Sequence, residues 1–334
     1  MQALLTASPV KAAAFALALA AFLPEAGIAQ SNFPDRQIKV IIPYPAGGAV
    51  DILARGLGEA FRQRTGQGFV VETRAGANTA LAAMACKGSA PDGYTLCLLA
   101  STTMSLNPHL YKSLRYSSAD VMPVTNIALS RAIFLLHKDV PANNFSEMVA
   151  YSKSHPEKMN YGSFGVGGET HLIMEWLKTK TGLQITHVPF TGFTPAQQAF
   201  DRGDIQVFIP PAVPAVMEKI ELKQAKAIMV LGDKRSGNLP DLPAIPDLGL
   251  PPVGIQTWFG MFVPAGTPAP LVEKLSAELR AIVNTKEFAD KFITGIGLIP
   301  EANTPAEFKA FLEKDYANAA ELVSLTGIKL ADQQ

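Results

Sequence analysis

Residues 38–51 read IKVIIPYPAGGAVD, and this stretch decides the fold class. A run of residues with high strand propensity comes first, and a turn of prolines and glycines follows it. From about Ala49 the spacing changes, because apolar residues now recur every four positions on one face of a helix, at Leu53, Leu57 and Phe61. A strand, a glycine turn and an amphipathic helix in that order are typical of α/β proteins with parallel strands.

The same order of elements continues along the chain. We expect further strands at residues 69–71, 94–99, 159–161, 185–188 and 205–209, and helices at 80–85 and from Asn144, Glu169 and Pro195. Residues 232–254 are rich in proline and show little periodicity, which indicates a connecting loop. The C-terminal third is predicted to be helical, with helices that open at Thr267-Pro268 and at Thr304-Pro305-Ala306-Glu307, a capping box. The alternation predicts two α/β domains.

The composition excludes several classes of protein. Of the 334 residues, 48 % are apolar and 17 % are charged, with 29 basic and 29 acidic side chains, so the formal net charge is zero. That balance, without a run of lysine and arginine, argues against DNA or RNA as a partner. The apolar content is enough for a large core. Two cysteines are too few for a disulfide scaffold or a four-cysteine metal cluster.

Residues 1–29 have the pattern of a secretory signal peptide. Lys11 precedes an apolar run of about a dozen residues, and the small residues Gly27 and Ala29 stand where signal peptidase cleaves. The run is shorter than the roughly 20 residues that a membrane helix needs, although an N-terminal membrane anchor is the alternative. We expect cleavage near Ala29 and export of the mature protein.

Cys86 and Cys97 fall at the end of a predicted helix and within the next strand. Export permits a disulfide between them. Two buried free thiols are an equal alternative, because contact between a helix and a strand does not guarantee the Cα separation of about 4.4–6.8 Å that a disulfide requires.

When the glycine-rich stretch YGSFGVGG at residues 161–168 is compared with three motifs of catalysis and cofactor binding, it matches none of them. A nucleophile elbow needs glycine where Tyr161 stands, a dinucleotide loop needs glycine where Thr170 stands, and a phosphate loop needs lysine where Gly168 stands. The five histidines never have the spacing of a helical zinc pair. We therefore expect no catalytic residue, no metal and no cofactor.

What remains are turns of small residues, each directly after a predicted strand, at residues 43–51, 101–103, 163–165 and 191–195. Glycines there expose backbone amides, and the positive end of a following helix dipole favours an anion. Because ligands of open α/β sheets bind outside the carboxyl ends of the strands, turns from two domains can face one cleft. The turns carry serine and threonine hydroxyls but no lysine or arginine, which favours a small carboxylate as the anion that they bind. Simple tight turns are the alternative for each segment.

Five separated motifs resemble those of one known family. They are PAGG at 45–48 followed by Asp51 and Ala54-Arg55, APDGYT at 90–95, HVPF at 187–190, GDI at 203–205 and WFGMFVPAGTP at 258–268. They look like the motifs of the periplasmic solute-binding proteins of the tripartite tricarboxylate transporter family, the Bug-type receptors. They also keep the family's order over nearly the whole mature chain.

The resemblance implies a two-lobed type II periplasmic binding protein fold, an α/β fold with the ligand in the cleft between the lobes. The first lobe would hold residues 33–130 and 256–334, and the second lobe residues 131–255. The resemblance further implies a periplasmic receptor, which we expect to be a monomer, that captures a small carboxylate and delivers it to the membrane permease subunits of a tripartite transporter. The turns and the resemblance together predict ligand-binding residues Tyr44, Ala46, Gly47, Gly48, Asp51, Ser101, Thr102, Ser163, Phe164, Gly165, Thr191, Gly192, Phe193 and Pro195.

Within that set, Asp51 is expected to brace its turn rather than touch an anionic ligand, because two carboxylates repel each other. The sequence also departs from the family, which usually has small residues where Phe164 and Phe193 stand and glycines where Ala77-Asn78-Thr79 stands. Two phenylalanines in cleft loops can stack on an aromatic ring, so we hypothesise an aromatic carboxylate as the ligand. In the alternative, both rings pack into their own lobe and the ligand is an aliphatic di- or tricarboxylate.

Two other functions stay open. A secreted enzyme could recruit Ser163 or Glu169, one of the acids next to a glycine-rich loop, to act on a carboxylate. A sensory protein could instead pass its closed form to a signalling receptor. Prolonged incubation separates the first of these from a transport receptor, because a receptor returns its ligand unchanged.

Overall fold

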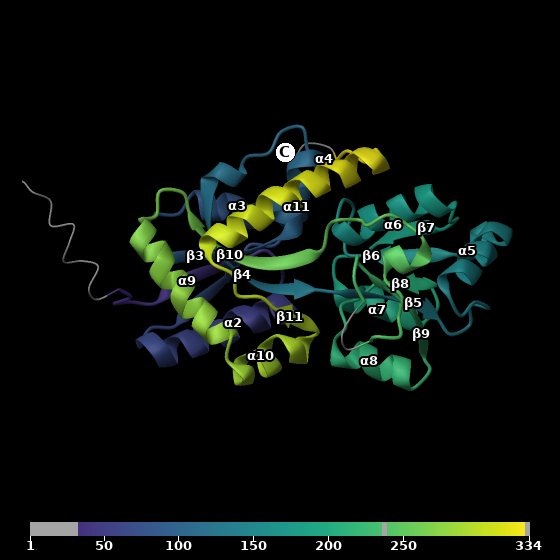
Figure 1. Cartoon of the computed structure of the whole chain (residues 1–334), viewed down its shortest axis with the longest axis horizontal. Helices are drawn as coiled ribbons and strands as arrows, with labels where there is room; N and C mark the ends of the chain where they lie inside the picture. The colour runs from purple at the N-terminus through teal and green to yellow at the C-terminus, as the bar shows by residue number, and fades with distance from the viewer. Residues whose placement is uncertain (1–32, 236–238, 331–334) are drawn as a thin grey trace, which may run out of the picture. The chain divides into compact units, whose positions relative to one another are not determined.

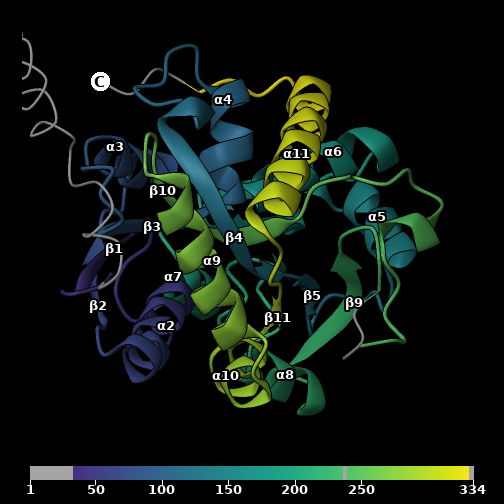
Figure 2. The same ribbon diagram turned by 60° about the vertical axis from the view of Figure 1, so that its left-hand side comes forward.

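The computed structural model describes residues 33–235 and 239–330, and Figures 1 and 2 together label the helices and strands. The expected signal peptide, residues 1–29, lies outside the described residues. The compact unit that holds the sheets and helices begins at Gln37. In the described part of the chain, no helix has both the length and the apolar character needed to cross a membrane.

The first sheet has six strands, which are β1 (Ile38–Ile42), β2 (Phe69–Thr73), β3 (Thr95–Ala100), β4 (Val121–Ser130), β10 (Thr257–Pro264) and β11 (Leu298–Pro300). Their order across the sheet is β11-β4-β10-β3-β1-β2. Strand β1 is parallel to both β2 and β3, as the strand-helix-strand succession requires. Strand β10 is antiparallel to β3 and β4, and β11 is antiparallel to β4.

The second sheet has five strands, which are β5 (Ala132–His137), β6 (Asn160–Ser163), β7 (Thr186–Pro189), β8 (Val207–Phe208) and β9 (Ala225–Leu231). Their order is β7-β6-β8-β5-β9. Strand β6 is parallel to β7 and β8, whereas β5 is antiparallel to β8 and β9. The chain thus leaves the first sheet after β4 and returns to it with β10. The lobe boundaries inferred from the sequence stay a prediction.

The helices that connect the strands are α2 (Ala49–Thr65), α3 (Ala80–Lys87), α4 (Asn107–Leu110), α5 (Phe145–Ser154), α6 (Glu169–Thr181), α7 (Phe193–Asp201), α8 (Pro214–Glu221), α9 (Ala269–Val283) and α10 (Lys286–Phe292), and α11 (Pro305–Thr326) follows the last strand. A π-helical segment, η3 (Thr102–Leu106), follows β3. The predicted capping box opens α11, because Thr304 Oγ1 accepts from the Glu307 amide and Glu307 Oε2 accepts from the Thr304 amide.

Helix α11 packs against both cores. Near its start, Phe308 meets Trp258 of β10 edge to face, with ring centroids 5.6 Å apart, in the core of the first sheet. Near its end, Ala319, Leu322 and Val323 belong to the core of the second sheet and contact α6. Figure 2 shows α11 running beside α6. The helix therefore ties the two sheets together by burial of apolar surface at both of its ends.

The sequence predicts β1, the strands that follow α2 and α3, and the helix starts well, but it misses the antiparallel strands. Both sheets are mixed rather than parallel, and the C-terminal third contains β10 and β11 besides its helices. Strand β4 is hard to see in the sequence, because Pro123 interrupts its pattern and cannot donate to the ladder. A register shift in the pairing with β10, next to Phe262 opposite Pro123, accommodates it. Helix α7 begins at Phe193, two residues before the predicted start at Pro195.

Cys86 at the end of α3 and Cys97 in β3 form a disulfide, with their Cα atoms 6.1 Å apart. The separation falls within the range that a disulfide tolerates. Of the two states that the sequence left open, the structure therefore has the disulfide.

Candidate functional site

The turn after β1 is built around Asp51 in the first turn of α2. Gly47 has φ +83°, a conformation that glycine adopts without strain. Its backbone amide donates to Asp51 Oδ2 at 3.0 Å, and Arg55 Nε donates to the same oxygen at 3.0 Å. Burial of Asp51, which is 5 % exposed, favours a higher pKa, but the hydrogen bonds from Arg55 and Gly47 hold the pKa of this carboxyl below its ordinary value. The carboxylate thus braces the turn.

Three helices begin with a glycine directly after a strand-end turn. Gly48 precedes α2, Gly168 precedes α6 and Gly192 precedes α7, and within the described chain no side chain caps any of these three starts. The first amides of an α-helix have no partner inside the helix, so these starts leave N–H donors for another acceptor. The helix dipole adds a preference for negative charge there.

Polar side chains from both sheets converge at the start of α6. Glu169 is the first residue of that helix, and its Oε2 accepts from Thr257 Oγ1, at the start of β10, at 2.6 Å. Ser101, directly after β3, donates to the same oxygen at 3.4 Å. Burial and then the charge of Glu169 raise the pKa of Tyr44, which lies in the turn after β1. Segments far apart in the sequence therefore meet around one carboxyl group.

Glu169 has an unusual electrostatic environment. Burial raises the pKa of Glu169 to about 7, and the negative charge of Asp315 adds to this, whereas the hydrogen bonds from Thr257 and Ser101 oppose it. Asp315 is buried and accepts from Trp258 Nε1 at 2.7 Å, and burial raises its pKa to about 6. Among the described residues, no lysine or arginine forms an ion pair or hydrogen bond with Glu169.

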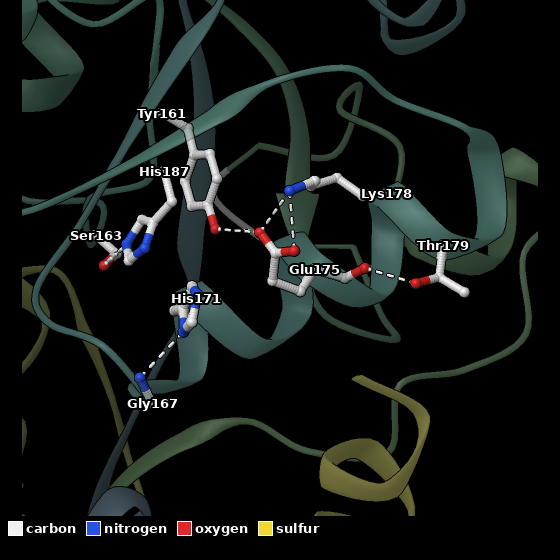
Figure 3. A network of polar contacts seen from close by, with 8 residues as sticks. All are labelled: Tyr161, Ser163, Gly167, His171, Glu175, Lys178, Thr179 and His187. Atoms are coloured by element: carbon white, nitrogen blue, oxygen red, sulfur yellow. Dashed lines mark hydrogen bonds and ion pairs between the residues drawn. The ribbon is translucent and has the colours of Figure 1, made fainter. Parts of the chain in front are cut away.

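Figure 3 shows a second polar network, behind the turn that follows β6. Ser163, which is 1 % exposed, makes a hydrogen bond of 2.6 Å between its Oγ and His187 Nε2. The amide of Gly167 donates to His171 Nδ1 at 3.0 Å. The His171 and His187 rings stack with centroids 4.1 Å apart, and burial, then the neighbouring His171, lowers the pKa of His187 to about 4. A neutral imidazole therefore holds Ser163 in place.

The other side chains of this network, Tyr161, Glu175 and Lys178, bond to one another and support the turn after β6. Tyr161 Oη donates to Glu175 Oε1 at 2.9 Å, and Lys178 Nζ forms an ion pair with the same oxygen at 2.9 Å. Figure 3 shows these three side chains on one side of the stacked histidines. Because Tyr161 and Lys178 engage the Glu175 carboxylate, and Ser163 also bonds the backbone of its own turn at Gly165, the network shapes the turn.

Two phenylalanines from separate turns meet on one buried ring. Phe164 is 42 % exposed, and its ring lies edge-on to Phe208, with centroids 6.1 Å apart. Phe193 is half-buried, and its centroid is 5.8 Å from that of Phe208, which is 1 % exposed. Both rings therefore pack within the second sheet's side of the molecule, as in the alternative for an aliphatic ligand, but Phe164 keeps a large exposed surface.

The structure brings some of the predicted site residues together and separates others. Tyr44, Ser101 and Thr102 lie at the ends of β1 and β3, near Glu169. The other predicted ligand-binding residues lie in three separate turns, and no ligand contact is assigned to them. Ala46, Gly47 and Gly48 form the turn before α2, and Asp51 lies in the first turn of that helix. Ser163 ends β6, and Phe164 and Gly165 follow it. Thr191, Gly192, Phe193 and Pro195 lie at the start of α7.

Thr257 was missed by sequence reasoning, and Glu169 was considered there for catalysis alone. Thr257 directly precedes the motif that starts at Trp258, which is the signal that could have pointed to it. Glu169 directly follows the glycines of its turn. A search for metal ligands finds no group of three or more histidine, cysteine or acidic side chains in the described part of the chain.

Comparisons with known proteins place the chain in a family. The model of the family described as Tripartite tricarboxylate transporter family receptor matches residues 53–328. Protein BugT of Bordetella pertussis is 29 % identical over 319 residues, which are 92 % of this chain and 96 % of that protein.

Two solved structures are similar over most of the chain. The R. palustris protein Rpa4515 with adipate has a TM-score of 0.81 at 28 % identity, and the match covers 89 % of this chain and 99 % of that one. MatC from Rhodopseudomonas palustris with bound malate has a TM-score of 0.76 at 27 % identity, and the match covers 87 % and 100 %. The resemblance found in the sequence and the two-lobed α/β fold that it implies are confirmed.

Proposed function

Because the chain belongs to the tripartite tricarboxylate transporter receptor family, we propose that it captures a small carboxylate between its two lobes and delivers it to the membrane permease subunits of such a transporter. In this proposal the signal peptide of residues 1–29 directs export, and the mature protein works in the periplasm as a monomer. The lobes are residues 33–130 with 256–334, and residues 131–255. The binding residues are those of the strand-end turns, joined by Glu169 and Thr257.

The observation that carries the proposal is the convergence of polar side chains from both sheets at the ends of their strands. Thr257 of β10 and Ser101, which follows β3, both donate to Glu169 at the start of α6, which supports a site between the proposed lobes. Ligands of open α/β sheets bind outside the carboxyl ends of strands, and β1, β3 and β6 all end nearby.

Amides and hydroxyls supply the proposed recognition of the carboxylate. The starts of α2, α6 and α7 after Gly48, Gly168 and Gly192 offer N–H donors, and the dipoles of these helices favour an anion. The adipate and the malate in the two similar structures support a carboxylate as the class of ligand. Asp51 has no part in the contact, because its carboxylate is engaged by Gly47 and Arg55.

An aromatic ligand is the finer part of the proposal. The exposed ring of Phe164 and the half-buried ring of Phe193 both contact the buried Phe208, so a ligand ring can extend the cluster. An added aromatic pair is worth about 0.5–1.5 kcal/mol beyond area burial. Replacing both Phe164 and Phe193 with alanine is expected to weaken an aromatic carboxylate by about three- to tenfold and an aliphatic one much less. Equal losses for both ligands would contradict aromatic specificity.

Thermal unfolding tests the proposal as a whole. Residues 30–334 are titrated with aliphatic di- and tricarboxylates and with aromatic carboxylates of matched charge. A true ligand at about 100 times its Kd adds roughly 2.7 kcal/mol to stability, which raises Tm measurably. Recovery of the bound ligand unchanged after prolonged incubation separates a receptor from an enzyme. If no carboxylate raises Tm, the proposed ligand class is wrong.

Two variants of Ala46, in the turn after β1, test whether this turn lies beside the carboxylate ligand. Ala46 is exposed between Pro45 and Gly47, so a longer side chain there is tolerated by the fold. Ala46→Glu is expected to weaken carboxylate binding at least tenfold, because it sets a like charge beside the anion. Ala46→Gln has nearly the same size without the charge and is expected to bind almost as wild type.

A further inference from the structure

The carboxyl group of Glu169 is held as a hydrogen-bond acceptor at the position where the two sheets meet. Thr257 Oγ1 and Ser101 Oγ both donate hydrogen bonds to Glu169 Oε2, at 2.6 and 3.4 Å. The Thr257 backbone also hydrogen-bonds to this carboxyl group. These contacts orient the group, and among the described residues no side chain donates to Oε1, so this oxygen can accept from a further partner.

Nothing basic in the described chain compensates this carboxylate. The ionisable groups that influence it or that it influences are Asp315, which is acidic, and Tyr44, whose raised pKa keeps it neutral at physiological pH. Asp315 accepts a hydrogen bond from Trp258, which belongs to the core of the first sheet. Glu169 is only partly exposed, and its pKa of about 7 reflects an ionised form that burial disfavours, so a positively charged partner would stabilise the carboxylate there.

The proposed ligand brings a negative charge into the same region. A plain di- or tricarboxylate would add repulsion to a site that already contains one acid, because like charges disfavour each other at short range. A protonated nitrogen on the ligand removes that conflict, since it donates to Glu169 while the ligand carboxylate takes the amides of the helix starts.

We propose that Glu169 is a specificity-determining residue that binds a protonated nitrogen of the ligand, so that the favoured ligand is a zwitterionic carboxylate. This inference rests on the proposed function, because it assumes that the site takes a carboxylate. The inference goes beyond the proposed function because it assigns Oε1 of Glu169 to a second group of the ligand.

Matched ligand pairs test the inference. Succinate is compared with aspartate, and 3-phenylpropionate with phenylalanine, by calorimetry at pH 8, since the members of each pair differ by one amino group. The aminated member is expected to bind wild type at least tenfold tighter. Glu169→Gln keeps an acceptor for Thr257 but loses the charge, and it is expected to reduce the preference to less than threefold. Glu301→Gln is the control, because Glu301 is a partly buried acid with a raised pKa outside this cluster, and it is expected to keep the full preference.

The outcomes distinguish the inference from the function on which it rests. If the unaminated acids bind wild type as tightly as the aminated ones, or more tightly, the inference is overturned while the carboxylate receptor stands. Tighter binding of unaminated acids at pH 6 than at pH 8 has the same meaning, because it identifies Glu169 as a protonated donor to the ligand. If no member of either pair binds, the inference is overturned, and the wider carboxylate panel of the thermal unfolding experiment decides separately whether the receptor function stands. The ratio of the Kd values of the unaminated and aminated acids, measured on wild type, tests the inference even if Glu169→Gln does not fold.

Discussion

The brace in the first turn allows a quantitative test. Asp51→Ala removes the acceptor of the Gly47 amide and the partner of Arg55. A hydrogen bond to a charged group contributes about 1.5–3 kcal/mol. The Arg55 side chain is 58 % exposed, so its ion pair adds no more than about 0–1 kcal/mol. We expect the free energy of unfolding to fall by about 2–3 kcal/mol.

The dependence of that loss on pH identifies its origin. The pKa of Asp51 is lower in the folded protein than in the unfolded chain, so its contribution is complete above the unfolded value of about 3.9 and is lost as pH falls through the folded value. The difference between wild type and Asp51→Ala is therefore expected to be constant from pH 7 to pH 5 and to shrink below about pH 4.

Urea unfolding at several pH values measures this difference from the midpoints, provided that the slope is unchanged. Asp241→Ala is the control, because Asp241 is exposed and its loss is expected to change stability by less than about 0.5 kcal/mol. A loss below about 1 kcal/mol for Asp51→Ala at pH 7, or a loss that stays the same at pH 3, would refute the idea that this charge braces the turn.

Two further predictions concern the core of the first sheet. Replacing both Cys86 and Cys97 with serine is expected to lower the free energy of unfolding by about 3 kcal/mol, because the bond closes a short loop whose ends lie 11 residues apart; an equal stability of wild type with and without reductant would contradict it. Gly260→Ala makes a Cβ clash with the Phe308 ring and is expected to cost about 1–3 kcal/mol, measured by urea unfolding. Phe308→Leu in the same chain should recover part of that loss, and no recovery would mean that the clash lies elsewhere.

The local parts of this structure follow from the sequence because their causes are local. Ile38–Ile42 has the strand propensity and α2 the apolar repeat that each element needs, and the glycines between them permit the turn. The capping box at Thr304 works over three residues, so its pattern can be read directly. The bracing contact of Asp51 is local as well, since Gly47 lies four residues away, and the sequence anticipated that role from the repulsion between Asp51 and an anionic ligand.

The pairing of distant segments could not be predicted in this way. Strand β4 is recognised as a strand through its pairing with β10, more than 100 residues later, while its own sequence is interrupted by Pro123. Phe164 and Phe193 could equally have faced a ligand or their own lobe, and packing on Phe208 is decided by the arrangement of the second sheet.

The sequence by itself determined the family, the parallel strands, most of the helix starts, and the turns in which ligand-binding groups are expected, because propensity, periodicity and motif spacing all act along the chain. The tertiary structure alone decided that Glu169 meets Thr257 and Ser101, 88 and 68 residues away. It also raised the pKa of Glu169 and joined Cys86 to Cys97. Burial and charge at such a position depend on what the rest of the fold brings beside it, and no local pattern encodes that neighbourhood.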